Sequence, residues 1–274
     1  MNYYERALAL KEETIAHRRF FHVNAEVGLN MPKGQAYVLE ELKKLGIDAK
    51  PCGHGVTATV GKPGKCILLR ADMDALPMPE ETGLPFSSEH PGKMHACGHD
   101  FHMSMMLAAC KMLKEFEDEI EGTVKICFQP NEETFGGAKD MIEHGVLENP
   151  KVDSALAIHI GPFGEPGELT YGKGPNMGSA DGFDITVKGK GCHGAAPHSG
   201  ISPINIGVHI YLALQELLAF ARKKLIPDYE KIEGLVRTTG AAFCLSGAGP
   251  TLLCITRSRR LTEVLEKKLD AITE

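Results

Sequence analysis

The residues best suited to chemistry lie in one six-residue stretch, His95-Ala96-Cys97-Gly98-His99-Asp100. Its imidazole and thiol donors occupy alternate positions, and alternate residues of an extended segment project to the same side. The side chains of His95, Cys97 and His99 therefore converge if the stretch is a loop or strand, but not on a helix, where residues two apart lie on different faces. Nitrogen and sulfur donors at this spacing are typical ligands of zinc and other borderline transition metals. The alternative is a polar turn with a chance cluster of histidines.

Acidic and imidazole side chains also follow three predicted strands. Short apolar runs predict these strands at residues 66–70, 124–128 and 153–160. The polar residues at or just beyond their ends are Asp72, Asp74, Glu132, Glu133 and His159. Ligand sites of parallel sheets lie beyond the carboxyl ends of the strands. A placement that repeats from strand to strand favours one shared site over separate surface turns.

The other elements of this part of the chain are those that would hold the site residues in place. Spaced apolar residues predict helices at 3–20, 34–45, 101–117 and 138–145. Asp100 is placed to cap the third of these helices. Strands that alternate with helices indicate an α/β fold with a mainly parallel sheet flanked by helices.

The pattern changes near residue 180, where we place a domain boundary. Residues 1–180 are the predicted metal-binding catalytic domain, and residues 181–274 are a second, smaller α+β domain. A loop of the second domain carries two further imidazoles, His193 and His198. Its first elements are predicted to be a strand, the loop that carries these histidines and an apolar helix, at residues 183–187, 189–198 and 204–218.

The composition narrows the class of protein. The chain has 274 residues, a net charge of −6 and no basic stripe, so nucleic acid is not an expected partner. Residues 1–19 lack the apolar core and cleavage site of a signal peptide, and no apolar run reaches the length that spans a membrane. The eight cysteines form no CxxC pair. Without an export signal, they are typical of reduced thiols in a cytoplasmic protein.

Five segments of the chain carry motifs of a known kind. They are residues 19–28 (Arg-Phe-Phe-His-Val-Asn-Ala-Glu-Val-Gly), 70–77, 95–100, 129–133 and 189–198. Together they resemble the amidohydrolase branch of a di-metal metallopeptidase family, peptidase family M20, which includes aminoacylases, hippurate hydrolases and indole-acetyl-amino-acid hydrolases. The resemblance covers residues 1 to about 218. It implies a zinc-peptidase-like catalytic domain, a ferredoxin-like lid domain and a homodimer formed through the lid.

The resemblance implies a role for each matching residue. Glu132 matches a general base that takes a proton from a metal-activated water. His193 matches a lid histidine that holds the substrate or its oxyanion, and His198 either contacts the substrate or holds the loop. The implied cofactor is a divalent transition metal, Zn, Mn, Co or Ni, with two ions in the site. The implied metal ligands are Cys97, His99, Glu133 and His159.

Other polar residues near these motifs have expected supporting roles. Asp72 and Asp74 either cap a turn or hold the ligands from behind by hydrogen bonds, and we favour the second role. Asp100 is expected to support the ligands in the same way. His95 is expected to be structural. Exposed positions on helices are expected for His102 and His144.

The resemblance changes toward the C-terminus. The closing segment of the family carries one more metal-binding histidine, and no histidine follows His209 here, so we expect a truncated catalytic domain without that segment. Residues 222–262, within a tail at 222–274, instead resemble the C-terminal part of homoserine kinase. The resemblance includes a glycine-rich loop, Ser246-Gly247-Ala248-Gly249-Pro250. These features predict a chimeric chain with a junction near residues 215–222.

The tail has its own predicted elements. Two short apolar runs predict strands at residues 241–245 and 251–255, and a final helix is predicted at 261–272. We expect these elements to combine with the strand at 183–187 and the helix at 204–218 into one βαββα layer of the lid.

Three functions are compatible with these features. The leading hypothesis is a metal-dependent amidohydrolase that cleaves an N-acyl amino acid or a related amide, with Glu132 as the base. The second is an impaired remnant that binds metal without turnover. The third is ATP-dependent phosphotransfer through residues 246–249. We do not expect the third, because the ATP-binding loop of such a kinase would lie in an N-terminal domain that this sequence lacks.

Overall fold

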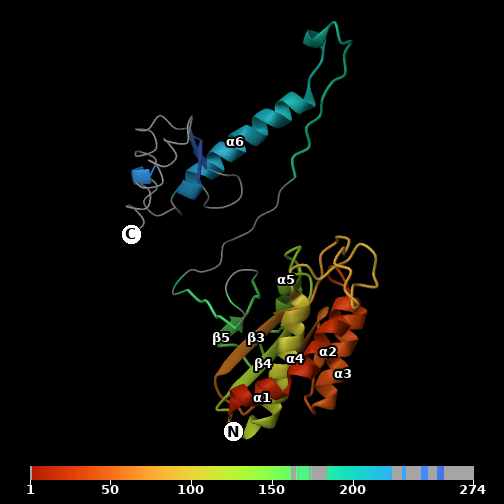
Figure 1. The fold of residues 1–274 in the computed structure, drawn as a ribbon, viewed down its shortest axis with the longest axis vertical. Helices are drawn as coiled ribbons and strands as arrows, with labels where there is room; N and C mark the ends of the chain where they lie inside the picture. The colour runs from red at the N-terminus through yellow and green to blue at the C-terminus, as the bar shows by residue number, and fades with distance from the viewer. Residues whose placement is uncertain are drawn as a thin grey trace. The chain divides into compact units, whose positions relative to one another are not determined.

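The structure, a computed structural model, describes residues 2–161, 165, 167–172, 174, 184–223, 230–232, 242–245 and 252–255. The chain divides into two compact units, Met1–Thr170 and Tyr171–Glu274. The sequence places the boundary near residue 180. Figure 1 shows the elements of each unit.

A five-stranded mixed sheet forms the centre of the first unit, in the order β1-β2-β4-β3-β5. Strand β3 is parallel to β4 and to β5, whereas β2 is antiparallel to its neighbours β4 and β1. The three parallel strands are the ones that the sequence predicts. The hairpin of β1 and β2 is not predicted, although Val56, Ala58 and Val60 alternate with two threonines along β2 and project into the main core cluster. The strands are β1 (Lys50–Cys52), β2 (Gly55–Gly61), β3 (Cys66–Asp72), β4 (Thr123–Gln129) and β5 (Ser154–Ala157).

Helices pack against this sheet. The helices α2, α3 and α4 lie together over one face of it (Figure 1). The single helix predicted at 3–20 is two helices, because the chain turns at the buried Leu10. The helices are α1 (Tyr3–Ala9), α2 (Lys11–Val23), α3 (Pro32–Lys44), α4 (His99–Glu115) and α5 (Gly137–Glu143), and a short 3-10 helix spans Glu117–Glu119.

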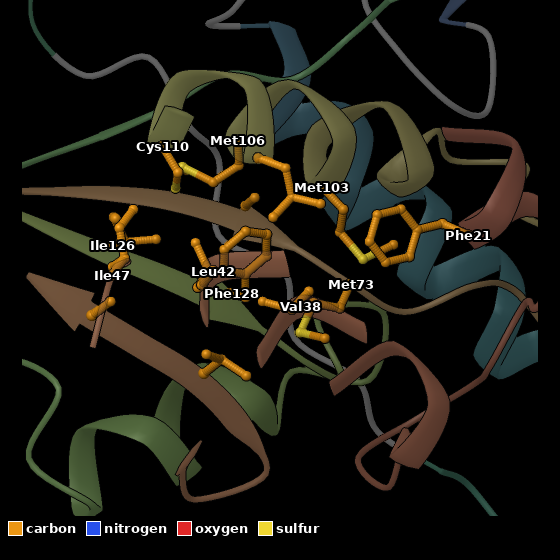
Figure 2. Packing of buried hydrophobic residues seen from close by; sticks show 14 of the residues in the cluster. Phe21, Val38, Leu42, Ile47, Met73, Met103, Met106, Cys110, Ile126 and Phe128 are labelled. Carbon is orange, nitrogen blue, oxygen red and sulfur yellow. The ribbon is translucent and has the colours of Figure 1, made fainter. Parts of the chain in front are cut away.

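Alternation along β4 divides the core into two clusters. Ile126 and Phe128 project into the main cluster, where they meet Phe21 and other side chains of α2, α3 and α4 (Figure 2). Cys127 projects from the opposite face and packs with Met141 of α5. Both faces of β4 are therefore buried. The carboxyl ends of β3, β4 and β5 meet at one edge of the sheet.

Lys125 is a buried cation on the α5 side of β4. Its side chain extends from the same face as Cys127 and is 3% exposed. Its Nζ donates to the carbonyl oxygens of Val146, Glu148 and Pro150, at 3.0, 2.7 and 2.7 Å. These three hydrogen bonds use every proton of the ammonium group. Lys125 therefore holds the turn that leads from α5 toward β5.

Replacing Lys125 by methionine is expected to lower the free energy of unfolding by at least about 2 kcal/mol. Methionine keeps the apolar stem but leaves three carbonyl groups without their donor, and each buried acceptor left unpaired costs about 1–3 kcal/mol. Urea unfolding measures the loss. The matched control is Lys139→Met, since Lys139 lies on the surface of α5. Equal stability of the two variants would contradict this role.

The second unit contains a 3-10 helix (Pro197–Ser199), α6 (Pro203–Lys223) and the strands β6 (Ala242–Leu245) and β7 (Leu252–Ile255). Strands β6 and β7 form an antiparallel pair, which confirms the two strands predicted there. Helix α6 confirms the helix predicted at 204–218. The glycine-rich turn at 246–250 and the helix predicted at 261–272 lie outside the described residues.

The predicted βαββα layer is wrong for the part of the chain that the structure describes. Residues 184–187 form no strand, and β6 and β7 form a sheet of two strands only. Ile185 is half exposed, so within the described ranges residues 184–187 have no partner surface on which to bury their apolar side. None of the helices within the described ranges is long and apolar enough to cross a membrane.

Candidate metal centre

Three groups of donor atoms meet where the parallel strands end. Within each group, one ligand atom per residue lies within 4.8 Å of the others. The donors come from the loop before α4, the first turn of α4, the last residue of β3 and the segments that follow β4 and β5. His99 belongs to all three groups. The groups are Cys97, His99 and His159; Asp72, His99 and His102; and His99, Glu132 and Glu133.

The ring of His99 is fully buried, yet neither nitrogen has a hydrogen-bond partner among the residues that the structure describes. Its nearest acidic oxygens belong to Asp72, at 3.6 Å from Nε2, and Asp74, at 3.6 Å from Nδ1. Glu133 Oε1, at 3.9 Å from Nε2, is likewise buried and unpartnered. Buried polar atoms are normally paired. An imidazole and a carboxylate that face each other without a bond fit a cation held between them.

Cys97 and His159 form the outer part of the cluster. Cys97 Sγ lies 3.4 Å from His159 Nε2, while His159 Nδ1 donates to the carbonyl oxygen of Ile160 at 2.6 Å. Burial, and then the negative charge of Glu133, raise the pKa of the Cys97 thiol to about 12. A thiol that binds a metal does so as the thiolate. Metal binding here would therefore release a proton and strengthen as the pH rises.

Two buried aspartates fix the donor residues in place through hydrogen bonds. Asp74 accepts the backbone N–H groups of Glu132 and Glu133, at 2.9 and 3.1 Å. Asp72 accepts hydrogen bonds from Arg70 Nη1 at 2.8 Å and from His102 Nδ1 at 2.5 Å. Both aspartates are 1% exposed. Their bonds fix the backbone that carries the two glutamates and the helix face that carries His99.

A second buried network surrounds Asp100, at the start of α4. Asp100 Oδ2 accepts from His22 Nδ1 at 2.8 Å and from Arg18 Nε at 3.0 Å. The other ring nitrogen of His22 lies 3.1 Å from Glu80 Oε1. An imidazole between two carboxylates donates from both nitrogens only when it is protonated. The hydrogen bond to Asp100 outweighs burial and raises the pKa of His22.

His22 is expected to make stability fall as the pH rises above about 6.5. A group whose folded-state pKa is raised contributes its full stabilisation below the unfolded pKa and loses it as the pH rises through the folded value. Glu80 does not titrate in this range, because hydrogen bonds from Ser88, Thr82 and His22 outweigh burial and lower its pKa to about 2. The stability difference between the wild type and His22→Gln should therefore be larger at pH 6 than at pH 9.

Urea unfolding at pH 6 and at pH 9, with a chelator present, measures the stability difference between the wild type and His22→Gln. The exposed His209 of α6 supplies a matched control, His209→Gln. A difference between the wild type and His22→Gln that does not change with pH would contradict the charged bridge.

The structure brings together most of the residues that the sequence singles out. His95 is buried but lies outside the three donor groups, and its Nδ1 has no hydrogen-bond partner. His193 and His198 are exposed residues of the second unit. His144 is exposed at the end of α5, as expected.

The prediction for His102 is wrong. This residue is 3% exposed and packs against Asp72 and the ring of His159. Its spacing from His99, three residues along a helix, places both rings on one face of α4. That spacing is the signal in the sequence that points to burial beside the site.

The fold and the donor set define a class of protein: an α/β protein with a metal centre at the carboxyl ends of its parallel strands. Residues 68–269 match the model of peptidase family M20/M25/M40, and the chain belongs to this family. The match continues through residues 222–262, beyond the limit near 218 that the sequence motifs indicate. It thus includes the stretch that we expected to resemble homoserine kinase.

Two named proteins and one crystal structure show what this chain is similar to. An N-acetyl-L-cysteine deacetylase of Bacillus subtilis is 37% identical, over 84% of this chain and 60% of its own length. An N-acyl-L-amino acid amidohydrolase of Geobacillus stearothermophilus is 38% identical, over 84% of this chain and 68% of its own. A Bacillus subtilis crystal structure, described as a dinuclear metal binding peptidase of the M20 family, is 35% identical with a TM-score of 0.54. The structural match covers 56% of this chain and 44% of the crystallised chain. The chain thus spans about 60% of the deacetylase's length.

Proposed function

We propose that this chain is a metal-dependent amidohydrolase that cleaves the amide bond of an N-acyl amino acid or a related small molecule. The observation that carries the proposal is the buried, unpartnered ring of His99 among the donor atoms of Cys97, Glu133 and His159. The names of the two relatives, a deacetylase of N-acetyl-L-cysteine and an N-acyl-L-amino acid amidohydrolase, support the substrate class.

The donor set fits divalent transition metals. Thiolate and imidazole donors suit Zn and its neighbours, and the additional carboxylate also suits Mn, Co or Ni. We assign the ligands of a two-ion centre to Cys97, His99, Glu133 and His159. When bound, such ions activate a water molecule and polarise the carbonyl group of the amide.

Glu132 is the residue that we assign to proton transfer. Asp74 holds the backbone N–H groups of Glu132 and Glu133 together, and both carboxylates belong to one donor group with His99. We divide the roles of ligand and base between them. Glu133 faces His99 and is assigned as a ligand. Glu132 then takes the proton of the attacking water and passes it to the leaving amine. His193 is assigned to hold the substrate or its oxyanion. His198, in the same loop, is assigned to contact the substrate or to hold that loop in place.

Hydrolysis of N-acetyl and N-benzoyl amino acids tests the proposal. The purified chain is loaded with Zn²⁺, Mn²⁺ or Co²⁺, its metal content is determined, and product amine is measured with and without a chelator. We expect bound metal and chelator-sensitive hydrolysis. Bound metal without turnover would favour the metal-binding remnant. A protein that neither binds metal nor hydrolyses these substrates would overturn the proposal.

Two further features remain proposals. A homodimer formed through the second unit would make hydrolysis depend on protein concentration, and sedimentation tests it. The homoserine-kinase-like tail is supported by the β6–β7 hairpin at the predicted position, whereas the family match through residue 269 favours one family across the chain. ATP titration with no detectable binding would dismiss phosphotransfer.

A further inference from the structure

His102 is a buried imidazole whose two nitrogens have different and defined partners. The backbone N–H of Ile160 donates to His102 Nε2 at 2.9 Å. Because a nitrogen that accepts a hydrogen bond carries no proton, the ring proton of the neutral imidazole must be on Nδ1. Nδ1 faces Asp72 Oδ1 at 2.5 Å. The contacts therefore select one tautomer, with Nδ1–H donating to the carboxylate.

Asp72 is itself fixed at the other end of this chain of bonds. Its second oxygen accepts from Arg70 Nη1 at 2.8 Å, and Arg70 Nε donates to Gln129 Oε1 at 3.0 Å. Arg70 and Asp72 belong to β3, and Gln129 ends β4. His102 thus connects two central strands to Ile160, which follows the edge strand β5.

The segment that carries His159 needs such a connection. Strand β5 is short, pairs with β3 on one side only, and its last ladder pair is Arg70 with Ala157. Residues 158–160 follow without a strand partner, and Ile158 is half exposed. Within the described residues, therefore, the β3–β5 ladder does not hold the backbone at this point. The bond from Ile160 N–H to His102 provides an anchor that the sheet does not.

Ile160 also connects His102 to the ring of His159. The carbonyl oxygen of Ile160 accepts from His159 Nδ1–H at 2.6 Å. This bond leaves Nε2 of His159 unprotonated and directed at Cys97 Sγ, 3.4 Å away. The rings of His102 and His159 meet edge to face, with centroids 4.6 Å apart. Ile160 thus donates one hydrogen bond to His102, which sets the position of its backbone, and accepts one from His159, which sets the orientation of that ring.

We propose that His102 is a positioning residue for His159: through the backbone of Ile160, it fixes the place and tautomer in which His159 presents Nε2 to a metal ion. The inference rests on the proposed metal centre. His102 is not itself a ligand, although its ring lies beside Asp72 and His99, because coordination would break one of its two bonds. Partners that orient a metal-binding histidine typically contribute 10–100-fold to metal affinity.

Two substitutions separate the two bonds of His102. In His102→Gln, the amide oxygen reaches the position of Nε2 and still accepts from Ile160. In His102→Asn, the shorter amide reaches the position of Nδ1 and still donates to Asp72, but Ile160 loses its acceptor. We expect His102→Asn to weaken Co²⁺ binding about 10–100-fold and His102→Gln to stay within about threefold of the wild type. Titration monitored by cobalt absorption measures the affinity, and the exposed His144→Asn is the control.

Amide hydrogen exchange of the metal-free proteins gives a second readout. The Ile160 amide should exchange faster in His102→Asn and stay protected in His102→Gln. If His102→Asn does not fold, Asp72→Asn takes its place. Arg70 then holds the carbonyl of the new amide, the NH₂ group faces His102 Nδ1, and the ring proton moves to Nε2, where it opposes the N–H of Ile160. We expect the same loss of Co²⁺ affinity.

The outcomes are distinct. A wild type that binds no Co²⁺ would overturn the proposed metal centre and the inference with it. A wild type that binds Co²⁺, with His102→Asn unchanged in affinity and exchange, would overturn the inference alone. Equal loss of affinity in His102→Asn and His102→Gln would also overturn it, because the bond to Ile160 would then not be the one that matters.

Discussion

Replacing Glu132 by glutamine is expected to lower the turnover of an N-acyl amino acid by about 10²–10⁴-fold while the metal stays bound. The amide has nearly the size of the carboxylate but cannot take a proton. The backbone N–H of residue 132 still donates to Asp74, so the loop that carries Glu133 keeps its place. Turnover of the loaded protein and its metal content, measured on the same sample, check the prediction.

The neighbouring residue provides the matched comparison. Glu133 Oε1 is buried, unpartnered and 3.9 Å from His99 Nε2, so Glu133→Gln should lose metal affinity as well as turnover. The two variants lie one position apart in the chain, and each replaces one carboxylate oxygen by an NH₂ group. If Glu132→Gln lost the metal and Glu133→Gln kept it, the roles of the two glutamates would be exchanged. Full turnover in Glu132→Gln would exclude it as the base.

The parts of the fold that the sequence predicts are those with a regular apolar pattern. Strands β3, β4 and β5 are short apolar runs bounded by polar residues, and their placement between helices indicates parallel pairing. Strand β2 is an exception: Val56, Ala58 and Val60 alternate with threonines along it, yet this strand is missing from the prediction. The strand expected at 183–187 shows the reverse error. Alternation alone does not make a strand where no partner strand is present.

The site follows a similar division. Residues at strand ends converge because parallel strands end at the same edge, so their neighbourhood follows from topology. The bonds of His102 and His22 depend on tertiary contacts instead. His102 meets the backbone of a residue 58 positions away, and Glu80 reaches His22 from a loop without a periodic pattern. No local signal specifies such partners. Only the spacing of His102 from His99 hints at its burial.

Replacing His99 by alanine is expected to abolish metal binding under conditions in which the wild type is fully loaded. His99 is the one residue common to all three donor groups among the described residues. Loss of a direct ligand should cost more than the 10–100-fold that an orienting partner contributes. A ligand present at 100 times its dissociation constant stabilises the folded protein by about 2.7 kcal/mol. Thermal or urea unfolding with and without added Zn²⁺ should show this increment in the wild type only.

The comparison with and without metal makes this test independent of the cost of the substitution itself. His99→Ala removes a fully buried ring, so the metal-free variant loses packing contacts whatever the ring binds. The increment on adding Zn²⁺ is a difference within one protein, and that packing loss cancels from it. His144→Ala, an exposed histidine outside the three donor groups, should keep the full increment. If His99→Ala kept it as well, the ions would be held without the residue on which the three donor groups converge, and the metal centre would have to lie elsewhere.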